Sequence, residues 1–297
     1  MTQAAPAQGD ARRVSFATGS GLTLVGDAWG PPDAAPVLLL HGGGQTRHAW
    51  AGTAVALAAR GWRAISLDQR GHGDSSWDPA GDYARSTYAD DVIDVARALR
   101  KPPVLVGASL GGIASLLAIH RAGPQPPLAA ALVLVDIATR MEPAGIERIF
   151  AFMQGHPDGF ASLEEAADAI AAYNPHRPRP KDLAGLRKNL RLGDDGRWRW
   201  HWDPAFMGTR DPAEPPREHH EADVAAESLT IPTLLVRGRM SDILSEAGVR
   251  VFLGQAPHAR FADITDAGHM VAGDRNDVFC EAVLDFLEAE LPPPDGG

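Results

Sequence analysis

The chain has 297 residues, 44% of them hydrophobic and 22% charged, and it carries a formal net charge of −10 at pH 7. This length permits a sizeable core, either as one large domain or as a core domain with an insertion. The acidic balance argues against a nucleic-acid partner, which requires a basic face, and the absence of an apolar run of about 18 residues argues against a membrane span.

Residues 1–11 and the single cysteine indicate the compartment. The N-terminal residues contain no apolar stretch of the kind found in a signal peptide, and their composition predicts a disordered segment. Cys280 has no second cysteine to pair with in the chain, which fits a reducing compartment. We therefore expect a cytoplasmic protein without a membrane partner, and the sequence favours neither a monomer nor a homodimer.

The first half of the chain alternates between β-rich and helical patterns. Residues 12–18 and 22–29 are short, β-rich and separated by a Gly-Ser-Gly turn, which predicts a hairpin. Further strands are predicted, in chain order, at 35–40, 62–68, 102–109 and 128–138. Helices are predicted between them at 47–61, 86–100 and 110–123. This alternation favours βαβ crossovers and a mainly parallel sheet.

After residue 138 the pattern becomes mostly helical. Helices are predicted at 143–153, 162–173 and 181–190, with proline-rich joints between them. The alternation resumes with a strand at 231–239, a helix at 245–256, a strand at 260–265 and a last helix at 276–291. We therefore predict a core domain made of residues 12–138 and 227–292, with a helical cap over residues 139–226.

Ser109 lies in a glycine-rich turn between a predicted strand and a predicted helix. Residues 107–111, Gly-Ala-Ser-Leu-Gly, match the pattern G-x-S-x-G, which holds a serine nucleophile on a strained turn above the end of a strand. A phosphate loop would need a G-K-[ST] sequence, and a dinucleotide loop would come in the first strand–helix turn. The remaining alternative is a packing turn with an incidental serine.

A serine nucleophile needs a base and an acid, and both candidates follow it in the chain. His269 lies after the last predicted strand, whereas His41 and His72 lie in earlier glycine-rich turns and are expected to be structural. Asp136 and Asp242 both end strands between the serine and the histidine. We favour Asp242 as the partner of His269, because its strand neighbours the histidine loop, and we give Asp136 a structural or pocket role.

The sequence His-Gly-Gly-Gly at 41–44 comes at the turn where a second oxyanion donor is needed. Glycine lets the backbone approach a substrate oxygen closely. We predict that the backbone N–H groups of Gly43 and Leu110 form the oxyanion hole, and that Gly44 shapes the turn and borders the pocket.

Five motifs together resemble the α/β-hydrolase superfamily, in particular its capped, epoxide-hydrolase-like and lactonase-like branch. They are LLLHGGG, DQRGHGDS, GASLGG, LLVRGRMSD and GHMVAGDR, and the resemblance covers about residues 12–291. It implies a mostly parallel, eight-stranded sheet with helices on both faces and a helical cap between strands six and seven. It also implies Ser109 as nucleophile, His269 as base, Asp242 as acid, and Gly43 with Leu110 as oxyanion donors.

The serine at this turn narrows the expected chemistry. Epoxide hydrolases and haloalkane dehalogenases of the superfamily attack with an aspartate, so Ser109 favours acyl transfer instead. We expect a hydrolase of carboxylic esters or lactones that needs no metal or organic cofactor. The same residues are compatible with hydrolysis of a C–C bond or with perhydrolysis, as in cofactor-free haloperoxidases. A ligand-binding receptor on this scaffold is the alternative outside enzymology.

The predicted cap contains an unusual aromatic segment. Trp198, Trp200 and Trp202 alternate with polar residues, so an extended segment would present all three indoles on one face. They either hold the cap onto the core or line the pocket, and we list Trp200, Phe150 and Met270 as pocket residues for an apolar or aromatic substrate of small to medium size. Residues 217–223, although rich in His and Glu, are expected to form a solvated loop rather than a metal site.

Overall fold

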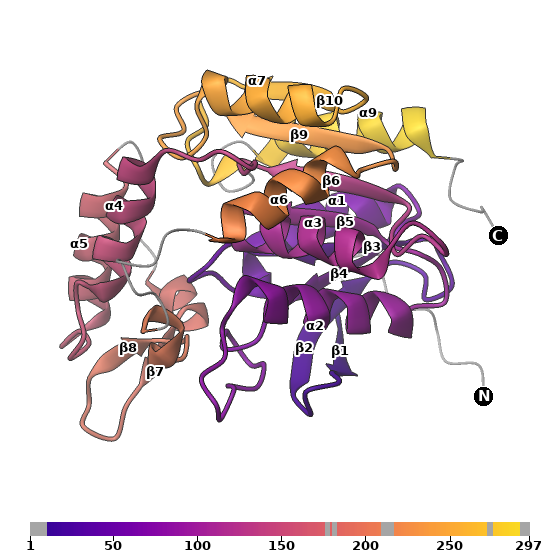
Figure 1. Ribbon diagram of the computed structural model, residues 1–297. Coiled ribbons are helices and arrows are strands. Elements are labelled where there is room, and N and C mark those ends of the chain that lie inside the picture. Colours follow the sequence, from indigo (N-terminus) through magenta and orange to yellow (C-terminus); the bar gives the residue numbers. More distant parts are fainter. Residues whose placement is uncertain (1–10, 176–178, 180–182, 209–216, 272–275, 292–297) are drawn as a thin grey trace, which may run out of the picture.

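An eight-stranded sheet forms the centre of the computed structural model, which describes residues 11–175, 179, 183–208, 217–271 and 276–291 (Figure 1). The strand order is β1-β2-β4-β3-β5-β6-β9-β10. The pairs β1–β2 and β2–β4 are antiparallel, and all other pairs are parallel. The strands are β1 (Arg12–Ala17), β2 (Thr23–Trp29), β3 (Pro36–Leu40), β4 (Arg63–Leu67), β5 (Val104–Ala108), β6 (Ala131–Val135), β9 (Thr233–Gly238) and β10 (Arg260–Ile264). The predicted mostly parallel sheet with its N-terminal hairpin is confirmed.

The burial of each strand follows its sequence pattern. Every residue of β3, β6 and β9 is buried, as expected for apolar runs covered by helices on both faces. In the edge strand β1, half-buried and exposed residues alternate, because only one of its faces is covered. Of the predicted disordered N-terminus, residues 1–10 lie outside the described residues.

Helices cover both faces of the sheet. One apolar core lies under α1 and α9, and the other lies under α2, α3, α6 and α7. The bounds are α1 (Ala51–Ala59, preceded by the 3-10 turn η1, Arg47–Trp50), α2 (Arg85–Ala98), α3 (Leu110–Ala122), α6 (Arg217–Glu227), α7 (Glu246–Gln255) and α9 (Asn276–Glu290). The prediction of a loop at 217–223 is wrong, because these residues form the first part of α6. This helix packs against α3. No helix within the described ranges is both long and apolar enough to cross a membrane.

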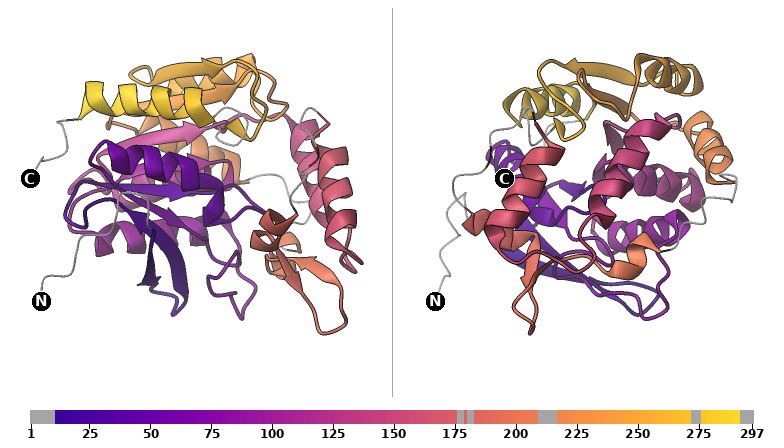
Figure 2. Two further views of the ribbon diagram at one scale, coloured as in Figure 1. Left: turned by 180° about the vertical axis from the view of Figure 1, so that it is seen from behind. Right: turned by 90° about the vertical axis from the view of Figure 1, so that its left-hand side faces the viewer.

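The segment between β6 and β9 forms the region predicted as a cap. Its elements before α6 are α4 (Pro143–Gln154), α5 (Leu163–Tyr173), η2 (Ala184–Lys188), β7 (Leu190–Leu192), β8 (Trp198–Trp200) and η3 (Pro204–Met207). Figures 1 and 2 place α4, α5 and the β7–β8 hairpin together beyond one end of the sheet. The helix predicted at 181–190 is wrong from residue 184 on, where a short 3-10 turn leads into β7. The predicted division of the chain at 139 and 226 stays a prediction.

Candidate active site

Ser109 occupies a strained turn between β5 and α3. Its backbone φ and ψ angles are 45° and −112°, a region that residues with a Cβ atom rarely adopt. Its side chain caps no helical N–H group, and its Oγ makes no hydrogen bond within the described part of the chain. The turn therefore presents the hydroxyl to the cavity that Ser109 lines.

The glycines on either side of Ser109 are required by close packing. A Cβ at Gly107 would lie 2.4 Å from the carbonyl carbon of Gly111, and a Cβ at Gly111 would lie 2.5 Å from the carbonyl oxygen of Leu40. Real Cβ atoms do not come so close to backbone atoms, so α3 can start this near β3 and β5 only with glycine at both positions. The G-x-S-x-G pattern thus serves the packing of α3 as well as the turn.

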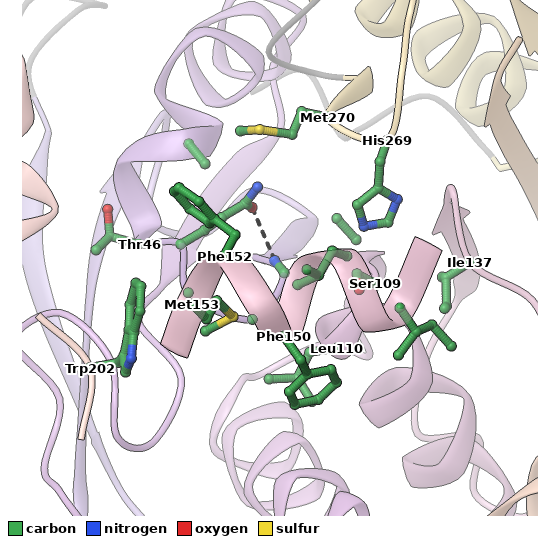
Figure 3. A pocket seen from close by; sticks show the side chains of 18 of the residues that line it. Thr46, Ser109, Leu110, Ile137, Phe150, Phe152, Met153, Trp202, His269 and Met270 are labelled. Carbon is green, nitrogen blue, oxygen red and sulfur yellow. Dashed lines mark hydrogen bonds between the residues drawn. The ribbon is translucent and has the colours of Figure 1, made fainter. Parts of the chain in front are cut away.

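His269 follows β10 and is hydrogen-bonded to Asp136 at the end of β6. Its Nδ1 donates to Asp136 Oδ2 at 2.7 Å, which leaves Nε2 free to accept a proton. Figure 3 shows the imidazole directed toward Ser109. Asp136 is completely buried and has a φ of 51°. Its carboxylate also accepts hydrogen bonds from Gly238 N–H at 3.0 Å and from Ser241 Oγ at 2.5 Å.

Asp242 does not contact the imidazole, and its predicted place beside His269 is wrong. Its carboxylate pairs with Arg148 of α4 at 2.7 Å, and it lines the cavity. The physical reason is the path of the chain after β9, where Ser241 points to Asp136 and Asp242 packs its backbone against Gly145 of α4. The pocket role predicted for Asp136 is also wrong, because its carboxylate lies behind His269, outside the cavity lining.

The turn after β3 brings the predicted oxyanion donors to the same cavity. Gly42 N–H donates to Gln45 Oε1 at 3.1 Å, whereas Gly43 N–H has no acceptor among the described residues. Leu110 N–H is likewise free within the described part of the chain, since it is the first residue of α3. Gly43 and Leu110 both line the cavity with Ser109 and His269. Their joint use as oxyanion donors stays a prediction.

His41 and His72 support this turn from the core, as predicted. His41 Nδ1 donates to Gly42 O at 2.8 Å, and His72 Nε2 accepts from Gly44 N–H at 3.1 Å. Burial lowers the pKa of both rings, because water no longer solvates the charged form. Both histidines are therefore neutral at pH 7.

The cavity has a volume of about 810 Å³ and lies between the carboxyl ends of the strands and the segment that connects β6 to β9. It is lined by the pocket residues predicted from the sequence, namely Gly44, Phe150, Trp200 and Met270, together with Phe152, Met153 and Phe206.

Two pairs of stacked rings form part of the cavity wall. Phe152 stacks on Tyr173, with ring centroids 4.2 Å apart, and Trp200 stacks on Trp202, with centroids 4.9 Å apart. Trp198 is not among the lining residues and lies instead beside Arg187.

Helix α4 supplies a row of apolar lining residues that sequence reasoning identified only in part. Ile146, Ile149, Phe150 and Met153 all border the cavity. Their spacing of three, four and seven residues is that of one helix face, so the periodicity alone could have located all four. Ser241 carries no comparable signal, because an isolated serine after a strand has no periodicity.

Comparisons with known proteins agree with this architecture. A family model described as alpha/beta hydrolase fold matches residues 35–275. Esterase Rv0045c of Mycobacterium tuberculosis is 31% identical over 277 residues, which span 88% of this chain and 85% of that protein. A solved structure of the same esterase aligns over 94% of this chain and 92% of its own chain. The sequence identity is 28% and the TM-score is 0.72.

A second relative is the 3-hydroxybutyrate-oligomer hydrolase of Cupriavidus necator. It is 30% identical over 260 residues, which span 81% of this chain and 85% of that protein. The first relative is an esterase and the second a hydrolase by name, and the family model covers most of the chain. The chain therefore belongs to the α/β-hydrolase family.

Proposed function

We propose that the protein hydrolyses carboxylic esters or lactones through an acyl-enzyme on Ser109. The observation that carries this proposal is the hydrogen bond between His269 and the buried Asp136, on the wall of the cavity that the strained Ser109 also borders. In this proposal Asp136, rather than Asp242, holds the tautomer of His269 that has a free Nε2.

The reaction would run in two halves. Ser109 Oγ attacks the ester carbonyl carbon and passes its proton to His269 Nε2, while the oxyanion accepts from Gly43 and Leu110 N–H. His269 then protonates the leaving alcohol, whose C–O bond breaks. Water, deprotonated by His269, then attacks the acyl carbon. The bond from this carbon to Ser109 Oγ breaks, His269 returns the proton to Oγ, and the carboxylic acid leaves. The buried Asp136 carboxylate stabilises the imidazolium in both halves.

The cavity wall supports an apolar or aromatic substrate. Its volume of about 810 Å³ lies within the range of about 300–1,000 Å³ that is usual for small-molecule sites. The Phe152–Tyr173 and Trp200–Trp202 stacks offer flat apolar surfaces, against which an aryl or branched alkyl group would pack.

The test is a panel of p-nitrophenyl esters, lactones and a ring-cleavage dienoate, measured on the wild type and on Ser109→Ala. We expect ester turnover in the wild type and a loss of at least about 10³-fold in the variant, since the covalent step is removed. A fluorophosphonate probe should label the wild type and leave Ser109→Ala unlabelled. Equal ester turnover in both proteins would reject the proposal. A preference for the dienoate over the esters would indicate that the protein hydrolyses a C–C bond instead.

A further inference from the structure

A third buried histidine, His201, joins the cap to the turn that carries the proposed oxyanion donor. It follows β8 and is only 1% exposed. Its Nδ1 accepts from the backbone N–H of Gly73 at 2.8 Å, and its Nε2 lies 3.3 Å from the carbonyl oxygen of Gly44. Because Nδ1 accepts, the proton of the neutral ring is on Nε2 and is donated to Gly44.

From Gly44 a chain of hydrogen-bonded peptide groups leads to Gly43. The Gly44 carbonyl belongs to the same planar peptide as the N–H of Gln45, which donates to Gly42 O at 3.1 Å. The Gly42 carbonyl in turn shares its peptide plane with the N–H of Gly43. His201 therefore acts at the far end of a chain of two peptide groups that ends at the Gly43 donor, and each bond in such a chain polarises the next.

The cap also packs directly on these glycines. A Cβ at Gly44, whose φ is +75°, would lie 2.9 Å from Met153 Cε and 3.3 Å from the Trp202 ring, and a Cβ at Gly43 would lie 3.2 Å from the Phe206 ring. The turn is thus enclosed by core histidines on one side and by cap side chains on the other, and His201 makes a directional hydrogen bond from the cap side.

We propose that His201 is a positioning residue for the oxyanion donor, so that docking of the cap sets the orientation of Gly43 N–H. This inference rests on the proposed serine-esterase function. His201 is expected to affect the transition state more than the bound substrate, because it holds a group that is used fully only when the oxyanion forms.

The ring must be neutral for this role, and its surroundings keep it so. Burial lowers the pKa of His201 to about 4, aided by His41, while Asp68 and the Gly44 carbonyl oppose the change. The His72 ring lies 5.8 Å away, and Arg191 also disfavours a charge on His201. A proton on Nδ1 would face the Gly73 N–H and break that contact.

Two substitutions separate positioning of the turn from simple docking of the cap. In His201→Gln the side-chain amide can reach the place of Nε2 and donate to Gly44, whereas in His201→Asn the shorter amide reaches only the place of Nδ1 and serves Gly73. We expect His201→Asn to lower kcat by about 10-fold to 100-fold, less than outright loss of an oxyanion donor, with KM nearly unchanged. His201→Gln should retain most of kcat, and His156→Asn, a cap histidine that contacts Phe160 away from the cavity, serves as the matched control.

Equal kcat values for the Asn and Gln variants would overturn the inference. If Ser109→Ala also keeps full activity, the proposed function itself fails; if it abolishes activity, only the role of His201 fails. Should both variants unfold, NMR of the Ser109→Ala protein gives the answer with His201 in place. The chemical shift of the Gly43 amide proton should then change with pH at the same midpoint as the His201 ring. A Gly43 chemical shift that does not change as His201 titrates would contradict the inference.

Discussion

The two aspartates that follow strands near the cavity differ in burial and in the partners of their carboxylates. Asp136 is completely buried and accepts hydrogen bonds from His269, Ser241 and Gly238. The side chain of Asp242 is 36% exposed and pairs with Arg148, which is 57% exposed. A buried carboxylate with fixed donors can hold an imidazole in one orientation, whereas an exposed ion pair on the cavity wall is screened by water. A position after the end of a strand is therefore not enough to bring an aspartate to the imidazole of His269; Asp136 reaches it and Asp242 does not.

The largest expected effect comes from exchanging the buried carboxylate for an amide. Asp136→Asn should lower kcat by about 10³-fold to 10⁴-fold, because an amide can donate to Nδ1 and thereby favour the wrong tautomer of His269. Asp242→Asn is the matched control and should change kcat by less than about 3-fold. Steady-state kinetics on one p-nitrophenyl ester measures both. A larger loss in Asp242→Asn would reverse the assignment of the acid.

Burial of His201 is expected to make the free energy of unfolding depend on pH. The pKa of His201 is about 4 in the folded protein against an ordinary value of 6.5, so the unfolded chain binds more protons between these values. The stabilising contribution is complete above pH 6.5 and is lost as the pH falls toward 4. It amounts to about 3 kcal/mol at about 1.4 kcal/mol per pH unit.

Urea unfolding of the wild type and of His201→Gln between pH 7 and pH 4 measures this contribution. The free energy of unfolding should fall more steeply with decreasing pH in the wild type than in the variant. Parallel curves for the two proteins would show that His201 titrates alike in the folded and unfolded states.

The aromatic wall should affect substrate selection rather than the chemical step. Trp200→Ala removes one ring of the stack on Trp202 and part of the cavity lining. We expect KM for a bulky aryl ester to rise by about 10-fold, with a smaller change for an acetyl ester, because only the bulky group reaches this wall. Trp198→Ala is the control, since Trp198 lies outside the lining. The same change in KM for both esters would show that Trp200 does not contact the bulky group of the substrate.

The smallest effect is expected at the exposed ion pair. Arg148→Met keeps much of the aliphatic part of the Arg148 side chain on α4 but removes its charge beside Asp242. The free energy of unfolding should fall by less than about 1 kcal/mol, as is usual for exposed pairs. Thermal unfolding at low and high salt measures this difference, and a loss of several kcal/mol would mean that Asp242 is held as firmly as Asp136.

Much of the site was predictable because its signals are local. Ser109 and the glycines around it are specified by a turn of five residues, and His41 and His72 lie in turns whose glycines mark them. The hairpin β7–β8 and the helix α6 were not predicted, because short strands and proline-flanked helices have weak periodicity. His201 has no distinguishing pattern in the sequence, and only the docking of the cap brings it to Gly44.

The sequence by itself determined the sheet, the serine turn and the place of the histidine after the last strand, since apolar periodicity and backbone sterics act over a few residues. Which of Asp136 and Asp242 is hydrogen-bonded to His269 depended on the tertiary structure, which sets the side-chain directions after β6 and β9. Those directions follow from the path of the chain after each strand and from packing against α4. A hydrogen bond between residues 133 positions apart has no local pattern from which it could be read.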